Sequence, residues 1–191
     1  MARNNAESAQ HTLNPISGPE LRRVLGHFAT GVTLLTCRDE GRARGMTASA
    51  FTSVSLDPPL VLVSVGKQAT TCRHIRASGA FAVNILSSEQ EEIARRFAGR
   101  HREMVDPFWD LAYRPGRSGS PILADVVAWV DCSLYATYDG GDHTLFLGQV
   151  VEIGLDADRG PILFYGGAFR QLGALGLDDA AFLPGTHRKT G

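Results

Sequence analysis

The stretch GMTASAFTSVSLDPP (residues 45–59) decides the fold, because apolar and hydroxyl side chains alternate along it with the two-residue period of a β-strand. Apolar residues share one face: Met46, Ala48, Ala50, Val54 and Leu56. Hydroxyl residues share the other: Thr47, Ser49, Ser53 and Ser55. A strand face in water normally carries charge, and none occurs in residues 45–56. The pattern therefore predicts a strand whose polar face meets either a ligand or a buried interface.

The composition around this stretch is that of one globular domain. The 191 residues are 43% hydrophobic and 20% charged, and their 19 basic and 20 acidic residues are interspersed. This balance provides no basic face for a nucleic acid. We expect a domain at residues 17–176, with a flexible N-terminal tail (1–16) and a C-terminal tail (177–191).

Neither a membrane span nor a secretory signal is expected. No apolar run approaches the roughly 20 residues that cross a bilayer, and the polar N-terminus lacks the apolar core of a signal peptide. The three cysteines, Cys37, Cys72 and Cys132, fit neither a disulfide framework nor a metal motif. We expect reduced, mostly buried thiols and a cytoplasmic protein.

Periodicity and turn signals predict a mainly β, mostly antiparallel barrel with short peripheral helices. Strands are expected at residues 31–37, 45–56, 59–65, 80–86, 126–138, 143–155 and 161–167. Helices are expected at residues 20–29, 71–79 and 87–99, the first behind a capping pair, Ser17 and Glu20. Residues 100–120 lack periodicity and predict a long loop. The DGGD segment (139–142) predicts a hairpin turn.

The usual catalytic and nucleotide-binding motifs are missing from the sequence. It has no GxGxxG, no GxxxxGK[ST], no GxSxG and no paired histidines at metal-ligand spacing, so no metal site is expected. Uncharged hydroxyl-rich and glycine-rich segments remain: TGVT (30–33), KQATT (67–71) and GGDHT (140–144). Such surfaces suit a neutral planar heterocycle such as a flavin ring. Lys67, before two threonines that open a helix, suits a phosphate.

Six segments, in order and spacing, resemble the flavin reductase-like family: FATGVTLLT, GMTASAFTSVSLDPPLVLVSV, SGAFAVNIL, IARRFAG, GSPIL and GGDHTLFLGQV followed by PILFYGGAF. The resemblance covers about residues 20–171. It implies an FMN-binding split β-barrel of Greek-key type and a homodimer with flavin near the subunit interface. It also implies hydride transfer from NADH or NADPH to N5 of FAD or FMN. The resemblance further implies that the reduced flavin reaches a partner monooxygenase by diffusion.

The resemblance also assigns site residues by position. Those implied to contact the flavin ring are Thr30, Gly31, Val32, Thr47, Ala48 and Ser49. Those implied along the ribityl chain are Ser53, Val54 and Ser55. Those implied near the phosphate and the flavin tail are Lys67, Thr71, Phe97 and Arg100. Those implied at the nicotinamide are Gly141, Asp142 and His143, of which His143 positions the ring or donates a proton. Ala69 stands where many relatives have serine, which leaves the choice between FMN and FAD open.

These assignments conflict with strict alternation, which turns Ala48 and Val54 away from the hydroxyl face. Either these two residues contact flavin through their main chain, or a β-bulge near Phe51 and Thr52 breaks the register. Because the cofactors carry the difficult chemistry, we expect no single side chain whose loss abolishes turnover.

Two alternatives to a flavin reductase remain. The same pocket suits a flavin-binding carrier or sensor without turnover. It also suits a split-barrel flavoenzyme that reduces an organic substrate directly, although the sequence offers no obvious acid–base pair for that reaction. NADH is the expected preferred donor, because the sequence has no conspicuous arginine cluster for the 2′-phosphate of NADPH. The choice between NADH and NADPH stays open, since the family binds nicotinamide in varied folded poses.

Overall fold

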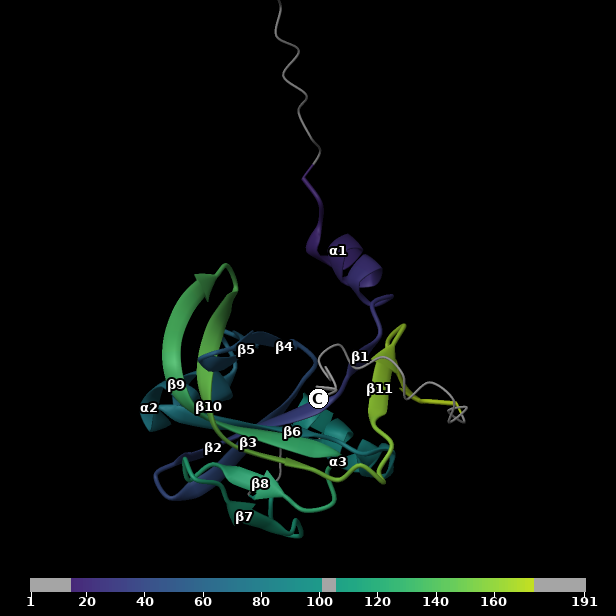
Figure 1. The fold of residues 1–191 in the computed structure, drawn as a ribbon. Helices are drawn as coiled ribbons and strands as arrows, with labels where there is room; N and C mark the ends of the chain where they lie inside the picture. Colours follow the sequence, from purple (N-terminus) through teal and green to yellow (C-terminus); the bar gives the residue numbers. More distant parts are fainter. Residues whose placement is uncertain (1–14, 101–105, 174–191) are drawn as a thin grey trace, which may run out of the picture.

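The computed structural model describes residues 15–100 and 106–173 (Figure 1). Residues 1–14 and 177–191 of the expected tails lie outside these ranges. The first helix, α1 (Gly18–Leu25), begins at the expected capping box, where the Glu20 amide donates to Ser17 Oγ and the Ser17 amide donates to Glu20 Oε2. No helix within the described ranges is long and apolar enough to cross a membrane.

Seven antiparallel strands form the main sheet, which confirms the mainly β prediction. Their order across the sheet is β3 (Arg42–Ala48), β2 (Thr33–Asp39), β6 (Ala80–Ile85), β9 (Ala128–Gly140), β10 (His143–Leu155), β5 (Pro59–Gly66) and β4 (Phe51–Leu56). The long β9–β10 hairpin turns at the predicted DGGD segment and projects from the sheet (Figure 1). Short connections join the antiparallel pairs β2–β3, β4–β5 and β9–β10, whereas the pairs β2–β6, β6–β9 and β5–β10 bring together strands that are distant in sequence.

The single strand predicted over residues 45–56 is two strands, β3 and β4, at opposite edges of the sheet. Only Ser49 and Ala50 separate them, and three Cα steps span at most about 11 Å. The sheet must therefore curl until its two edges approach, as in a split barrel. We call the gap between β3 and β4 the seam. The sequence prediction failed here because alternation continues through a change of pairing partner.

The register break also differs from the predicted bulge at Phe51 and Thr52. The chain leaves the sheet at Ser49 and Ala50, and the irregularity in the pairing of β4 with β5 lies between Ser53 and Ser55. Val54 therefore sits at the bulge, and its side chain is 51% exposed. Strict alternation along residues 45–56 does not hold.

Two smaller sheets complete the fold. One contains β1 (Thr30–Gly31), β11 (Ile162–Tyr165) and β12 (Ala168–Gln171), so the run predicted as one strand over residues 161–167 turns into a hairpin. The other contains β7 (Tyr113–Pro115) and β8 (Pro121–Leu123), which correct the expectation of a loop over residues 100–120. The hairpin was missed because long-range hydrogen bonds hold it: the Thr36 hydroxyl donates to the Pro121 carbonyl, and the Leu123 amide donates to Asn84 Oδ1.

Further helical segments pack against the main sheet. The predicted helix over residues 71–79 is α2 (Thr70–Ser78), which ends at Gly79 in the left-handed conformation. The helix predicted over residues 87–99 consists of three segments, the 3₁₀ turn η1 (Ser88–Gln90), α3 (Glu91–Arg95) and the π-helical turn η2 (Arg96–Arg100).

Two hydrophobic clusters lie on opposite faces of the sheet. Leu35 belongs to one cluster with Phe81 and Phe146, whereas its neighbour Leu34 belongs to the other, which we call the outer cluster, with Phe108 and Leu123. Successive side chains of a strand point to opposite faces, so β2 contributes to both clusters. The three cysteines are free and buried, as expected, and burial raises the pKa values of Cys37 and Cys132 to about 12.

Candidate functional site

A cavity of about 670 Å³ opens at the seam of the sheet, and we call it the seam cavity. Its walls come from the segment after α1, from β1, from the break between β3 and β4, and from the facing strands β5 and β6. The lining residues are Leu25, Phe28, Ala29, Thr30, Gly31, Thr33, Ser49, Ala50, Phe51, Thr52, Leu62, Ser64 and Ile85. The lining contains no charged side chain, and the cavity therefore suits a neutral, mostly apolar ligand.

A second cavity of about 430 Å³ adjoins the first, and we call it the turn cavity because it reaches the β9–β10 turn. It is lined by Gly18, Leu21, Arg22, Leu25, Gly26, Phe28, Thr30, Ser49, Asp142, His143 and Phe164. Leu25, Phe28, Thr30 and Ser49 line both cavities. The two spaces therefore meet at these four residues along the seam, and His143 lines only the second.

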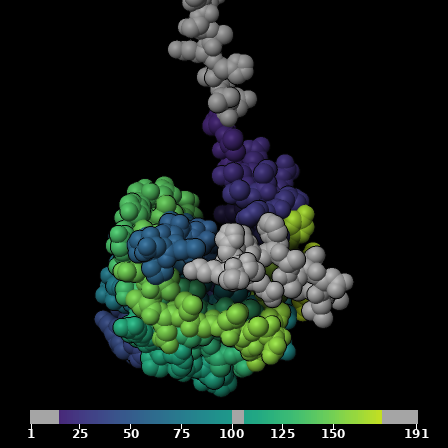
Figure 2. All heavy atoms as spheres, in the orientation of Figure 1, coloured from purple at the N-terminus to yellow at the C-terminus, as the bar shows by residue number. Residues whose placement is uncertain are grey.

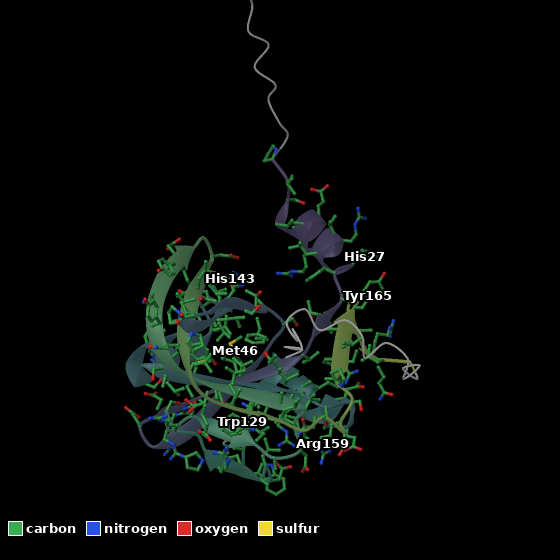
Figure 3. All side chains as sticks on the ribbon, in the orientation of Figure 1. His27, Met46, Trp129, His143, Arg159 and Tyr165 are labelled. Atoms are coloured by element: carbon green, nitrogen blue, oxygen red, sulfur yellow. The ribbon has the colours of Figure 1, made fainter. Side chains whose placement is uncertain are left out.

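The β9–β10 turn holds Asp142 and His143 in a defined arrangement. Gly141 adopts φ +77°, and its amide donates to Asp139 Oδ1 at 3.0 Å. The Asp142 carbonyl accepts from the Lys67 amide at 3.0 Å, which fastens the turn to the end of β5. His143 Nδ1 lies 2.7 Å from Asp142 Oδ1, and this hydrogen bond holds the pKa of the Asp142 carboxyl below its ordinary value. Figure 3 places His143 on the side of the hairpin that faces α1.

Polar groups without partners gather where the two cavities meet. Within residues 15–100 and 106–173, the amides of Ser49 and Ala50 and the hydroxyls of Thr30 and Ser49 make no hydrogen bond. A Cβ atom at Gly31 would meet no heavy atom within 4 Å, so this glycine leaves space beside the same groups. Neutral donors and acceptors around an apolar space fit the carbonyl and nitrogen edge of a flavin ring.

Other sequence-predicted ring contacts lie elsewhere. The side chain of Val32 is in the outer hydrophobic cluster, and Ala48 is buried at the end of β3. The Thr47 hydroxyl donates to the Ala94 carbonyl at 2.7 Å and so joins β3 to α3. The structure therefore gathers Thr30, Gly31 and Ser49 at the seam cavity, and it does not bring the side chains of the other three residues there.

The residues predicted along the ribityl chain and near the phosphate line neither of the two cavities. Ser53, Val54 and Ser55 lie on the edge strand β4, and none of them lines either cavity. Lys67 is paired with Asp139 at 2.6 Å, and this contact holds the pKa of the Asp139 carboxyl below its ordinary value. Thr71 is buried in the first turn of α2. The assignments of Ser53, Val54 and Ser55 to the ribityl chain and of Lys67 and Thr71 to the phosphate remain predictions.

The predicted flavin-tail residues lie on η2. Phe97 makes an edge contact with Phe108, with ring centroids 4.8 Å apart, and its ring passes close to Gly45. Phe97 therefore packs in the outer cluster. Arg100 ends η2, and its side chain lies outside the described residues.

Several cavity residues were not singled out from the sequence. Leu25 and Phe28 precede the quoted TGVT segment, and Ala50, Phe51 and Thr52 stand inside the opening stretch. Apart from Thr52, their apolar side chains resemble core residues, and only the structure shows that they line a cavity. In α1 no residue is buried, and Figure 2 shows this helix, in purple, standing out from the rest of the domain. The signal that identifies the cavity residues of α1 is an apolar helix face with no buried residue, and only the structure reveals this exposure.

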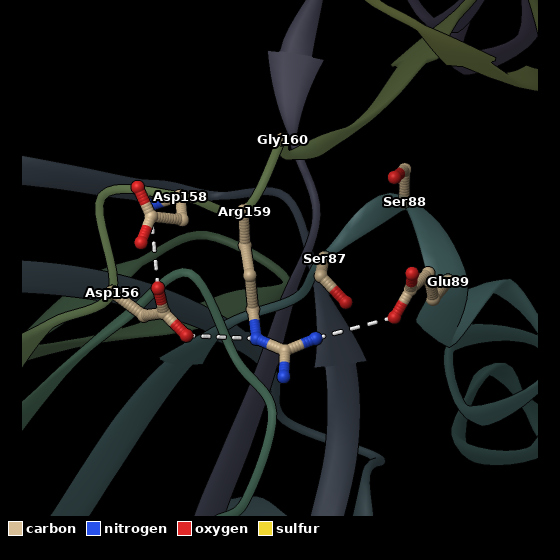
Figure 4. A pocket seen from close by; sticks show the side chains of 7 residues that line it. All are labelled: Ser87, Ser88, Glu89, Asp156, Asp158, Arg159 and Gly160. Atoms are coloured by element: carbon tan, nitrogen blue, oxygen red, sulfur yellow. Dashed lines mark hydrogen bonds and ion pairs between the residues drawn. The ribbon is translucent and has the colours of Figure 1, made fainter.

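A third cavity, of about 370 Å³, differs from the first two because polar and charged residues line it (Figure 4). At its centre Arg159 contacts three carboxylates, those of Glu89, Asp125 and Asp156. These contacts join η1 to the segment after β10, and hydrogen bonds and ion pairs hold the pKa of the arginine above its ordinary value. The cluster is a surface ion-pair network that joins three segments of the chain, because Asp125 lies between β8 and β9.

Comparisons with known proteins identify related sequences and structures. Residues 25–173 match the family model described as "Flavin reductase like domain". An NADH-dependent flavin reductase from Rhodococcus sp is 43% identical over 162 residues, which cover 83% of this chain and 89% of the relative. The reductase subunit HsaB of a flavin-dependent monooxygenase from Rhodococcus jostii is 39% identical over 148 residues, covering 78% of this chain and 74% of the relative.

A solved structure is similar over the same region. It is the Streptomyces globisporus C-1027 NADH:FAD oxidoreductase SgcE6 in complex with NAD and FAD fragments. The two structures superimpose with a TM-score of 0.78 at 42% identity, over 85% of this chain and 99% of that chain. From the family match, the relatives and the shared fold together, the chain belongs to the flavin reductase-like family.

Proposed function

We propose that this chain is an NADH-dependent flavin reductase, which transfers a hydride from the nicotinamide to N5 of a flavin and releases reduced flavin to a partner monooxygenase. One observation carries the proposal: the seam cavity and the turn cavity are continuous and share Thr30 and Ser49. Two cofactors that exchange a hydride need adjoining spaces, and this pair of cavities provides them.

The seam cavity is proposed to hold the flavin ring. Thr30, Ser49 and Ala50 would hydrogen-bond its polar edge through the unpaired groups described above, while Phe51, Leu62 and Ile85 provide apolar walls. When bound, the nicotinamide and the flavin supply the redox chemistry. The role of the chain is to bind them, orient them and place main-chain amides where negative charge develops.

The turn cavity is proposed to hold the nicotinamide. With Asp142 ionised, its carboxylate accepts a hydrogen bond from Nδ1–H of His143, which fixes the ring orientation and leaves Nε2 as an acceptor. His143 is then a positioning group for the nicotinamide end of the donor. A role as proton donor would require the imidazolium form.

FAD and NADH are the proposed cofactors. The Streptomyces structure contains NAD and FAD fragments, and the Rhodococcus relative is described as NADH-dependent. A partner monooxygenase is proposed because HsaB is the reductase subunit of such an enzyme. Release by diffusion is supported by the exposure of Ser49 and Ala50 at the cavity wall, which leaves the ring site open to solvent.

We further propose a cytoplasmic homodimer. Exposed apolar side chains on α1 and β4, among them Val24 and the 93% exposed Leu56, support a second copy on this side of the domain. The free, buried cysteines support a reducing compartment. The domain is proposed to span residues 17–176, within which the family model matches 25–173. Light scattering at several concentrations tests the dimer.

The test of function is an assay of the purified full chain with NADH or NADPH and with riboflavin, FMN or FAD. We expect flavin-dependent oxidation of NADH, with product flavin released into solution and recaptured by a monooxygenase. Tightly retained flavin with negligible oxidation of either nucleotide would instead favour a flavin carrier. Reduction of an organic substrate without any partner enzyme would favour a direct reductase.

A further inference from the structure

Arg22 lies on the face of α1 that borders the turn cavity. The residues of α1 that line this cavity are Gly18, Leu21, Arg22 and Leu25, which follow the i, i+3, i+4, i+7 spacing of one helix face. Arg23 is also exposed and lines neither the seam cavity nor the turn cavity. The helix therefore presents one of two adjacent arginines to the cavity.

Arg22 is also the only lysine or arginine that lines the seam cavity or the turn cavity. Its guanidinium has no hydrogen-bond or ion-pair partner within residues 15–100 and 106–173. The nearby Lys67 is paired with Asp139 at 2.6 Å, and Asp142 is paired with His143. The charge of Arg22 is thus the one cationic charge at these cavities that no described residue neutralises.

The position of Arg22 is set by contacts at the end of its helix. The Gly166 amide donates to the Gly26 carbonyl at 2.8 Å. His27 Nδ1 lies 3.3 Å from the Tyr165 hydroxyl, and the two rings meet edge to face with centroids 5.7 Å apart. Figure 3 shows this pair between α1 and β11. The β11–β12 hairpin therefore holds the end of α1 that carries the cavity-facing side chains.

We propose that Arg22 binds the pyrophosphate of the reduced nicotinamide dinucleotide, while His143, which lines the same cavity, contacts the nicotinamide. The inference rests on the proposed function. A dinucleotide carries two negative charges on its pyrophosphate, and a planar guanidinium binds such oxygens in a bidentate manner. The turn cavity would then offer Thr30, Ser49 and the His143–Asp142 pair to the nicotinamide and the Arg22 guanidinium to the pyrophosphate.

A flavin phosphate could also bind a guanidinium, but the residues that line the cavities favour the dinucleotide as the ligand of Arg22. Arg22 shares a cavity with His143 and does not line the seam cavity, where the flavin ring is placed. Riboflavin, which has no phosphate, separates the two sources when it replaces FAD as acceptor. An Arg22 that served the flavin would lose its effect with riboflavin, whereas an Arg22 that serves the dinucleotide would keep it.

The test compares Arg22→Gln with the unchanged full chain, using NADH and 1-benzyl-1,4-dihydronicotinamide, a hydride donor without phosphate. With riboflavin as acceptor, we expect kcat/KM for NADH to fall about tenfold through KM and kcat/KM for the benzyl donor to stay within about twofold. Arg22→Lys should recover part of the loss, because it keeps the charge without the planar fork. Arg23→Gln, on the same helix, should match the unchanged protein.

Calorimetric titration of NADH into flavin-free protein provides a readout that does not need turnover. We expect Arg22→Gln to weaken NADH binding about tenfold, and the loss to shrink at high salt. Equal losses for both hydride donors, an effect seen with FAD but absent with riboflavin, or unchanged NADH binding would each overturn the inference. If the unchanged protein bound NADH but never oxidised it, the proposed function would fail, whereas the Arg22 inference would still be decided by the titration.

Discussion

His143 Nδ1 lies 2.7 Å from Oδ1 of its chain neighbour Asp142, and both residues line the turn cavity. Gly141, with φ +77°, directly precedes the pair in the β9–β10 turn. The pair fixes the orientation of the imidazole before any ligand arrives. A preset ring lowers the entropic cost of binding the donor.

Replacement of His143 by alanine should therefore weaken the nicotinamide donor more than the flavin. We expect the KM for NADH to rise about tenfold, because one polar contact is lost, while the dissociation constant of FAD changes by less than about twofold. Steady-state kinetics and a flavin fluorescence titration measure the two quantities. Equal losses for both cofactors would contradict the assignment of His143 to the nicotinamide.

Gly31→Ala should separate cofactor binding from stability. The added methyl group meets no heavy atom of the chain within 4 Å, so the melting temperature should be unchanged or slightly higher. The methyl group enters the seam cavity and should weaken FAD binding about fivefold or more by crowding the ring. A variant that bound FAD as well as the unchanged protein would place the flavin elsewhere.

Gly148→Ala is the matched control with the opposite result. Its Cβ would lie 2.5 Å from Cζ of Phe81 and 2.8 Å from Cβ of Cys132, inside the barrel core. We expect the free energy of unfolding to fall by about 1–3 kcal/mol, as measured by denaturant titration. Flavin affinity of the folded fraction should be unchanged, since Gly148 lines neither of the two adjoining cavities.

The ion pair between Arg96 and Asp110 should make stability depend on pH in the acid range. The hydrogen bond from Arg96 holds the pKa of the Asp110 carboxyl below its ordinary value of 3.8. A carboxyl whose pKa is lowered by folding stabilises the fold above its unfolded pKa, and this contribution disappears as pH falls through the folded value. Asp110→Asn should therefore lower the melting temperature by a few degrees at pH 6, with the difference shrinking below pH 3.8. A constant difference from pH 6 to pH 2 would contradict this account.

The buried thiols should resist modification in the native protein. Burial raises the pKa values of Cys37 and Cys132 to about 12, so almost no thiolate is present at pH 8. We expect a chromogenic disulfide reagent to react with these two cysteines only after denaturation. Cleavage and mass spectrometry identify the sites, and rapid native labelling of either residue would contradict the burial.

The local elements of the fold were predictable because their signals are local. The Ser17–Glu20 capping box and the DGGD turn each depend on residues within four positions of one another. The identity of the site came from the resemblance of six segments to a family. Neither the local signals nor the resemblance could place Val54 at a bulge or the side chain of Val32 in the core, because both outcomes depend on which strands pair.

Contacts between distant segments account for what the sequence could not provide. The β7–β8 hairpin depends on Asn84, a fully buried amide that donates to the Leu34 carbonyl and accepts from the Leu123 amide. Thr30, Ser49 and His143 are separated by 19 and 94 positions and meet only because the sheet curls. Alternation predicts that a segment is a strand, but it does not specify the neighbour.

The seam between β3 and β4 determines which main-chain groups stay unpaired, as well as how the strands are connected. A barrel that closed there would use the edge amides and carbonyls for strand pairing and would leave no space for a ring. Because β3 and β4 do not pair with each other, the amides of Ser49 and Ala50 keep no hydrogen-bond partner among the described residues, and substitution of side chains cannot remove those groups. Recognition through such main-chain amides does not depend on which side chains stand beside them.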